Sequence, residues 1–195
     1  VVKAGKIIAK GYHQKAGLSH AEVEALEAAG RRAKGADLYV TLEPCTHYGK
    51  TPPCVDRILE AGIRRVFTGM IDPNPLNNGK GIKLLREHGI KIECGILEDE
   101  LRKINQPFLK YITLKTPYIT VKVGQSLDGK IALKTRESQW ITSKPAREYS
   151  HSLRRFYDGI MVGVNTVIRD NPSLSGGKPD RPLTKIVADS SLSTP

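Results

Sequence analysis

Residues 36–61 read ADLYVTLEPCTHYGKTPPCVDRILEA, and they indicate the fold class more clearly than any other part of the chain. The opening part of this stretch, 36–42, is rich in β-branched and aromatic side chains and predicts a strand. Its closing part, 54–61, places apolar side chains at helical spacing and predicts a helix. A strand that leads through a loop into a helix is the repeating unit of α/β domains, so this stretch predicts a layered α/β fold.

The same alternation continues on both sides of this stretch. Upstream, we expect a strand at residues 5–12 and a helix at residues 19–34, with Ser19 as its N-terminal cap and Glu22 as the capping-box partner. Downstream, the expected elements are a strand at 65–71, a helix at 81–88, a strand at 90–96 and a helix at 98–109. This alternation of strands and helices predicts one domain with a central sheet over residues 1–116.

A second unit is predicted from residue 117, because Pro117 interrupts the pattern. It is expected to contain strands at 118–123, 131–132, 159–164 and 185–189 and a helix at 144–156. Residues 117–195 are few for a complete α/β domain, so we interpret this unit as the first part of one. We also expect both ends to be cut, because the chain starts at Val1 without a methionine and stops directly after a strand-like segment.

The composition restricts the class of protein. A net charge of +11 suits an anionic partner, either a nucleic acid or a phosphorylated small molecule, although a generally basic, solvated surface explains the charge equally well. Three cysteines argue against a disulfide framework and for a reducing compartment, which we interpret as the cytoplasm. No apolar run approaches the roughly 20 residues of a membrane helix, and no signal-peptide pattern opens the chain.

Four residues suggest a catalytic metal centre. His20, Cys45 and Cys54 offer one imidazole and two thiolates, a donor set that suits Zn²⁺ in a tetrahedral site with one open position. A catalytic zinc needs that open position for water, and Glu22 lies close enough in sequence to His20 to act as the proton shuttle.

The motif matches zinc-dependent deaminases in its first half and departs from them in its second half. Those enzymes carry H-x-E followed by P-C-x-x-C, with the glutamate as acid and base rather than as a ligand. The first half is present as His20-Ala21-Glu22. In the second half, eight residues rather than two separate Cys45 from Cys54, so the insert must loop out and return the second thiolate to the metal.

Other interpretations of these residues stay open. Taken alone, His20 and Glu22 are ordinary residues for a helix start, and the two cysteines are ordinary small apolar residues. A structural zinc site is also possible, because His47 offers a fourth ligand. Two other functions also stay open. One is a tRNA-type zinc deaminase that acts on nucleic acid, and the other is a non-catalytic binding module stabilised by zinc.

Beyond the metal motif, several longer segments resemble the bifunctional deaminase/reductase family of riboflavin biosynthesis. The segments that resemble its deaminase part are SHAEVEAL at 19–26, VTLEPCTHYGKTPPC at 40–54 and DPNP at 72–75. Those that resemble its reductase part are SLDGKIA at 126–132, SQWIT at 138–142 and VGVNTVIRDNPSL at 162–174. The eight-residue cysteine spacing distinguishes this family from other deaminases, so the resemblance is specific.

The resemblance implies a fold and an activity for each unit. Residues 1–116 would form a cytidine-deaminase-like three-layer domain without its N-terminal helix, and residues 117–195 the first part of a dihydrofolate-reductase-like α/β domain. The first would use Zn²⁺ to deaminate 2,5-diamino-6-ribosylamino-4(3H)-pyrimidinone 5′-phosphate. The second would use NADPH to reduce the ribosyl group to a ribityl chain in the full-length enzyme. The implied partners are this small nucleotide and further copies of the chain, as a dimer or tetramer, rather than a nucleic acid or a membrane.

The resemblance also assigns site residues. His20, Cys45 and Cys54 match the family's zinc ligands, and Glu22 matches its proton shuttle. The residues that fall on its pyrimidine and phosphate pocket are His13, His47, Lys50, Asp72 and Asn74. Those that fall on its reductase substrate and cofactor positions are Lys122, Ser138, Trp140, Arg154, Thr166 and Asp170. Asp72 and Asn74 also suit a simple proline-rich turn.

Overall fold

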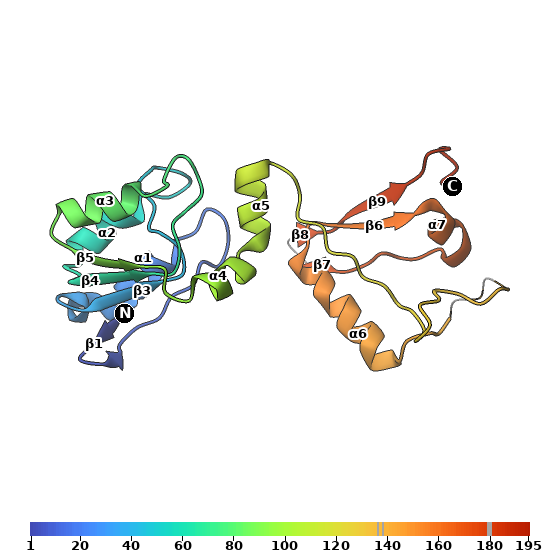
Figure 1. Ribbon diagram of the computed structural model, residues 1–195, viewed down its shortest axis with the longest axis horizontal. Helices are drawn as coiled ribbons and strands as arrows, with labels where there is room; N and C mark the ends of the chain where they lie inside the picture. The colour runs from blue at the N-terminus through green and yellow to red at the C-terminus, as the bar shows by residue number, and fades with distance from the viewer. Residues whose placement is uncertain (136, 138, 179–180) are drawn as a thin grey trace. The chain divides into compact units, whose positions relative to one another are not determined.

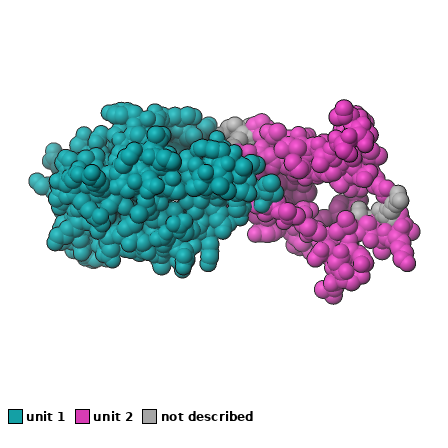
Figure 2. Space-filling view, turned by 45° about the horizontal axis from the view of Figure 1, so that its top comes forward, with its two compact units in different colours: residues 1–119 teal, residues 120–195 magenta. Residues whose placement is uncertain are grey.

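The computed structural model describes residues 1–135, 137, 139–178 and 181–195. The chain divides into two compact units, Val1–Ile119 and Thr120–Pro195 (Figures 1 and 2). Of the helices in the described ranges, none is both long enough and apolar enough to cross a membrane.

The first unit is built on a five-stranded sheet in the order β2-β1-β3-β4-β5 (Figure 1). Its strands are β1 (Val2–Lys3), β2 (Lys6–Ile7), β3 (Asp37–Val40), β4 (Arg65–Thr68) and β5 (Lys91–Cys94). The last three run parallel, with Asp37 beside Arg65 and Arg65 beside Lys91, whereas β1 runs antiparallel to β3. The carboxyl ends of the three parallel strands therefore meet at one edge of the sheet.

Helices cover one face of this sheet and form the core with it. They are α1 (Ala21–Ala29), which continues into a 3₁₀ turn (Gly30–Ala33), α2 (Cys54–Glu60) and α3 (Lys80–Glu87). Alternate residues of a strand point to opposite faces, so Leu38 of β3 and Val66 of β4 share the face that meets Leu26, Ile58 and Leu85 of the helices. Each such buried side chain contributes about 1.5–3 kcal/mol to folding.

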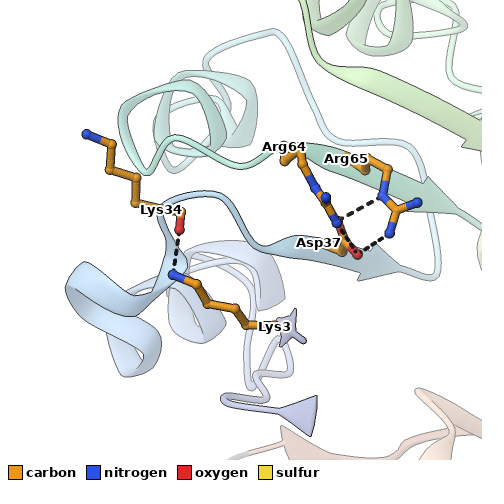
Figure 3. A network of polar contacts seen from close by, with 5 residues as sticks. All are labelled: Lys3, Lys34, Asp37, Arg64 and Arg65. Atoms are coloured by element: carbon orange, nitrogen blue, oxygen red, sulfur yellow. Dashed lines mark hydrogen bonds and ion pairs between the residues drawn. The ribbon is translucent and has the colours of Figure 1, made fainter. Parts of the chain in front are cut away.

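The opposite face of the sheet carries charged and aromatic side chains. The rings of Tyr39 and Phe67 stack with their centroids 4.4 Å apart. At the amino end of β3, the buried Asp37 accepts hydrogen bonds from Arg65 (3.0 Å) and Arg64 (3.1 Å), as Figure 3 shows. The pKa of Asp37 is lowered, chiefly by the hydrogen bond from Arg65 and then by that from Arg64. Lys3, drawn in the same figure, donates to the carbonyl oxygen of Lys34 at 2.7 Å.

The structure corrects three expectations for this unit. The predicted strand at 5–12 is wrong in extent, because only Lys6–Ile7 pairs in the sheet. The capping box is wrong: α1 begins at Ala21 with His20 at its N-cap, and no side chain caps it. The helix predicted at 98–109 is two helices, α4 (Glu98–Ile104) and α5 (Gln106–Leu114). The break is explained by Pro107, which lacks the N–H that a continuous helix needs.

The second unit contains a parallel pair of strands. Its elements are α6 (Lys144–Leu153), a 3₁₀ turn (Arg154–Phe156), β6 (Gly159–Gly163), α7 (Val164–Asp170), β7 (Gly177–Lys178), β8 (Arg181–Pro182) and β9 (Thr184–Ala188). Strand β6 pairs in parallel with β9, and α7 lies in the crossover between them (Figure 1). Ser143 caps α6, since its hydroxyl accepts from the N–H of Ala146 at 3.4 Å.

Two predicted strands of this unit are wrong, and one helix was not predicted. Residues 118–123 and 131–132 form no strand, and Val121 is 80% exposed. An alternating pattern gives a segment two faces, but a strand also needs a neighbour to accept and donate its hydrogen bonds. Helix α7 was missed because its sequence, VNTVIRD, is short and rich in residues of modest helix propensity.

Candidate metal centre

The structure brings the three predicted ligands together. His20 lies at the N-cap of α1, Cys45 follows β3, and Cys54 is the first residue of α2. The His20 Nδ1 atom lies 3.1 Å from the Cys54 sulfur and 3.5 Å from the Cys45 sulfur. The three ligand atoms all lie within 4.8 Å of one another, which is close enough for one metal ion to contact each of them.

The charges of the two thiols also suit a cation. The backbone N–H of Cys54 donates to the Cys45 sulfur at 3.3 Å. The pKa of Cys45 is lowered to about 5, chiefly by the hydrogen bond from the Cys54 thiol and also by His20. The pKa of Cys54 is raised by the same bond and by burial. Only one sulfur is therefore stabilised as a thiolate by the protein alone, and a divalent cation would stabilise both. One imidazole and two thiolates fit Zn²⁺ with a fourth position for water.

Glu22 lies beside the sulfurs rather than at a helix cap. Its carboxylate accepts a hydrogen bond from the Cys54 thiol. Burial raises the pKa of Glu22, and the neighbouring Cys45 raises it further. A carboxyl group with a raised pKa binds and releases a proton closer to neutral pH, which is the property that acid and base catalysis requires.

The insert between the two cysteines contributes a contact to His20. The Thr51 hydroxyl lies 3.4 Å from His20 Nε2, the nitrogen that faces away from the sulfurs. A partner on the second ring nitrogen fixes the orientation of a metal-binding histidine. Thr51 could not be predicted from the sequence, because nothing in the spacing shows which residue of the loop returns to the histidine.

His13 lies against His20. The two rings are 5.2 Å apart and nearly perpendicular, and His13 Nδ1 lies 3.0 Å from the carbonyl oxygen of Ser19. Gly11 makes this approach possible: a Cβ atom there would lie 2.4 Å from the carbonyl oxygen of Ala21. The loop that carries His13 therefore crosses α1 at backbone contact distance.

His47 and Lys50 lie on the insert. The Nδ1 atom of His47 is buried and has no hydrogen-bond partner among the described residues. A buried polar atom without a partner is costly, so a group that binds here and hydrogen-bonds to it is favoured. The Lys50 side chain is exposed and extends toward Gly17.

Asp72 and Asn74 lie in the loop after β4. Asp72 is buried, and its Oδ1 accepts from the N–H of Asn74 at 2.9 Å. Burial raises the pKa of Asp72, and the His47 ring lowers it in part, which places these two groups within electrostatic reach of each other. The Asn74 side-chain oxygen accepts from the N–H of Leu76 at 3.1 Å, so this oxygen is already used within the turn.

The predicted residues of the second unit do not form one cluster of hydrogen bonds or ion pairs within the described ranges. Trp140 is 68% exposed, and the guanidinium carbon of Arg147 lies over its ring, 4.0 Å from the ring centroid. Arg154 donates to the carbonyl oxygen of Ser175. Lys122 is exposed in an irregular segment, and Thr166 and Asp170 lie four residues apart on α7. Ser138 lies outside the described residues.

Two protein families match this chain, one in each of its two units. A family described as the cytidine and deoxycytidylate deaminase zinc-binding region matches residues 1–70, which contain His20, Glu22, Cys45 and Cys54. The RibD C-terminal domain family matches residues 117–195. The riboflavin biosynthesis protein RibD of Aquifex aeolicus is 57% identical over 175 residues, which are 90% of this chain and 49% of that protein.

The chain belongs to the RibD family. RibD of Bacillus amyloliquefaciens is 47% identical over 197 residues, which cover all of this chain and 53% of that protein. A deaminase/reductase from Thermotoga maritima has a similar structure, with a TM-score of 0.88 and 43% identity over 96% of this chain and 54% of its own. The structure of RibD from Acinetobacter baumannii has a TM-score of 0.87 and 41% sequence identity, and the match covers 98% of this chain and 56% of that chain. The chain thus spans about half the length of the RibD proteins it matches.

The family gives each unit its fold. The first unit is a cytidine-deaminase-like domain, and the second belongs to the RibD C-terminal domain, which is dihydrofolate-reductase-like. Both fold classes were predicted from the sequence by resemblance, and this prediction is confirmed.

Proposed function

We propose that the first unit is a zinc-dependent deaminase that hydrolyses 2,5-diamino-6-ribosylamino-4(3H)-pyrimidinone 5′-phosphate. One observation carries this proposal: the His20 nitrogen and the sulfurs of Cys45 and Cys54 converge within 4.8 Å, beside the Glu22 carboxyl group. The Thermotoga maritima protein is named as a diaminohydroxyphosphoribosylaminopyrimidine deaminase and 5-amino-6-(5-phosphoribosylamino)uracil reductase, which supports the same substrate class.

The residues of the site divide the chemistry among themselves. A zinc ion held by His20, Cys45 and Cys54 would act as a Lewis acid and would make water a nucleophile near neutral pH. A Glu22 carboxylate oxygen takes a proton from the attacking water and delivers it to the departing amino nitrogen. The ring carbon gains a bond to oxygen and loses its bond to nitrogen, and ammonia leaves.

The neighbouring residues bind the substrate in this proposal. The unpaired Nδ1 of His47 offers a hydrogen bond to the pyrimidine ring, and His13, Asp72 and Asn74 line the rest of the pocket. Lys50 provides a cation for the 5′-phosphate, a role that suits an exposed and flexible ammonium group.

We propose that the second unit is part of an NADPH-dependent reductase that converts the ribosyl group to a ribityl chain. The family match over residues 117–195 supports this role. Its proposed substrate and cofactor residues are Lys122, Ser138, Trp140, Arg154, Thr166 and Asp170. Two further parts of the proposal are a dimeric or tetrameric assembly and a place in the cytoplasm, which suits three free cysteines.

Metal analysis and an ammonia-release assay test the deaminase proposal together. The zinc-loaded chain is expected to hold one zinc ion and to release ammonia from the diaminopyrimidine nucleotide but not from tRNA or single-stranded DNA. Release from the nucleic acids alone would instead identify a nucleic-acid deaminase. Bound zinc without release from any substrate would identify a binding module.

A further inference from the structure

Glu43 is a buried carboxylate that the proposed mechanism does not use. It is 3% exposed and lies two residues before the ligand Cys45. Its Oε1 atom accepts from the N–H groups of Gly81 (2.8 Å) and Ile82 (3.2 Å). Its Oε2 atom accepts from those of Gly79 (2.9 Å) and Asp72 (3.1 Å). One side chain therefore holds both the start of α3 and the residue Asp72 in the loop before it.

Asn77 is a second fully buried polar side chain, and it ties the same two segments together. Its Oδ1 atom accepts from the backbone N–H and from the hydroxyl of Thr46, each at 3.0 Å. Its amide nitrogen donates to the carbonyl oxygen of Pro44 and to Asp72 Oδ2, each at 3.3 Å. An asparagine side chain offers two acceptor and two donor positions, and all of them are used here.

The backbone of α3 is shaped to fit this arrangement. A Cβ atom on Gly81 would lie 2.2 Å from the carbonyl oxygen of Pro44, so a side chain there would push α3 away from Glu43. The N-cap residue of α3 is Gly79, which has no side chain to accept hydrogen bonds from the free N–H groups of the first turn. Glu43, which is distant in sequence, satisfies them instead.

We propose that Glu43 and Asn77 are positioning residues for substrate binding. They join residues 43–46, which contain the ligand Cys45, to residues 72–82, which contain the pocket residue Asp72. The Asp72 carboxyl group is thereby held at a set distance from the metal ligands, and the substrate ring binds between them. This inference rests on the proposed deaminase function.

The variant Glu43→Gln tests the proposal with little change of size. The glutamine NH₂ group would face backbone N–H groups that need an acceptor, so the loop with Asp72 shifts while Cys45 keeps its own backbone contacts. We expect the Michaelis constant for the nucleotide to rise about tenfold, with kcat within about threefold of wild type. Zinc content is expected to remain unchanged. The amides of Asp72, Gly79, Gly81 and Ile82 are expected to exchange hydrogen faster.

Thr46→Val is a milder second variant. It removes the hydroxyl donor to Asn77 but keeps the backbone N–H donor, so the Michaelis constant is expected to rise less than in Glu43→Gln. Asp37→Asn is the matched control, because Asp37 is also a buried acid of the same sheet but lies at the opposite end of β3. It is expected to lower stability and to leave the Michaelis constant unchanged.

The results separate this inference from the function on which it rests. Unchanged Michaelis constants in both Glu43→Gln and Thr46→Val would overturn it, as would an equal rise in Asp37→Asn. If the zinc-loaded wild-type chain releases no ammonia, the proposed function fails by itself. Hydrogen exchange then decides whether Glu43 holds the loop and the start of α3 in place. Exchange rates at Gly79, Gly81 and Ile82 that are the same in Glu43→Gln as in wild type would show that it does not.

Discussion

A buried acid lies at the first residue of β3, Asp37, and another, Glu43, lies three residues beyond its last residue, and the two are paired differently. At the amino end, Asp37 is paired with Arg64 and Arg65, whose side chains are 60% and 41% exposed. Beyond the carboxyl end, the side chain of Glu43 accepts hydrogen bonds from backbone N–H groups of the loop before α3 and of the first turn of α3. Charge pairing at the amino end stabilises the sheet, whereas backbone pairing at the carboxyl end determines where a loop lies.

Asp37 also differs from Glu22, the acid of α1 beside the metal ligands, in the direction of its pKa shift. Arginine hydrogen bonds lower the pKa of Asp37, whereas burial raises the pKa of Glu22 beside the metal ligands. A lowered pKa means that folding favours the carboxylate, and a raised pKa means that folding disfavours it. Folding therefore gains stability from the ionised Asp37, whereas it loses stability when Glu22, the proton acceptor of the proposed site, ionises.

The largest expected effect comes from removing a ligand at the carboxyl end. Cys54→Ser is expected to abolish stoichiometric zinc binding and with it all ammonia release, because serine is a poor ligand for zinc compared with a thiolate. Cys94→Ser is the matched control, since Cys94 is exposed and lies outside the ligand cluster. Metal analysis of both variants after zinc loading provides the measurement. A fully zinc-loaded Cys54→Ser protein would contradict the assignment.

Glu22→Gln is expected to separate binding from turnover. Glutamine keeps the shape of the side chain but cannot accept the proton, so kcat should fall by about 10²–10⁴-fold. Zinc content and substrate binding are expected to stay close to wild type, because Glu22 is not a ligand. Steady-state ammonia release and metal analysis together provide the test. Retained turnover would show that another group moves the proton.

Asp37→Asn is expected to show the reverse pattern, with activity kept and stability reduced. The free energy of unfolding should fall by about 0.5–2 kcal/mol, since solvent screens the two exposed guanidinium groups. Denaturant unfolding of wild type and variant at pH 7 measures this difference. A loss of zinc or of turnover in this variant would mean that the two ends of the sheet are coupled.

The smallest expected effect is in the pH dependence of stability, where the two acids have opposite signs. The stabilisation by Asp37 is complete above about pH 3.9 and is lost as pH falls through the lowered folded pKa. The advantage of wild type over Asp37→Asn should therefore shrink in that acid range. The cost of Glu22 is absent below about pH 4.3, grows as pH rises from there toward its raised folded pKa, and is constant above that pKa. Metal-free Glu22→Gln should therefore gain stability over metal-free wild type as pH rises, and parallel curves would contradict this.

The sequence was sufficient to predict the parts of the site that depend on short motifs. His20-Ala21-Glu22 and the two cysteines of the stretch 36–61 are residues of restricted chemistry, and the structure places them together. The alternation of strands and helices predicted the order of elements from α1 to β5, but neither the pair β1 and β2 nor the division into α4 and α5. The helix start was misplaced by two residues, because the chain there uses His20 at the N-cap to direct its Nδ1 toward the sulfurs.

The sequence was not sufficient where the partner is a backbone group far along the chain. Glu43 accepts from amides 29 to 39 residues away, and amides are present at every residue except proline, so no pattern reveals them. Asn77 was missed for the same reason, since it lies in a segment that also reads as a simple turn. The strand predicted at 118–123 failed because pairing depends on a neighbouring strand rather than on the segment itself.

Gly11 limits which amino-acid substitutions this protein tolerates. A methyl group at this position would lie 2.4 Å from one backbone atom of α1 and 2.6 Å from another. In a library of all single substitutions, position 11 is therefore expected to be as intolerant as a metal ligand, although glycine has no side chain to perform chemistry. At Gly49, by contrast, the space for an added methyl group is open and the backbone is outside the left-handed region. Mutational sensitivity in this domain should thus follow backbone crowding as well as reactivity.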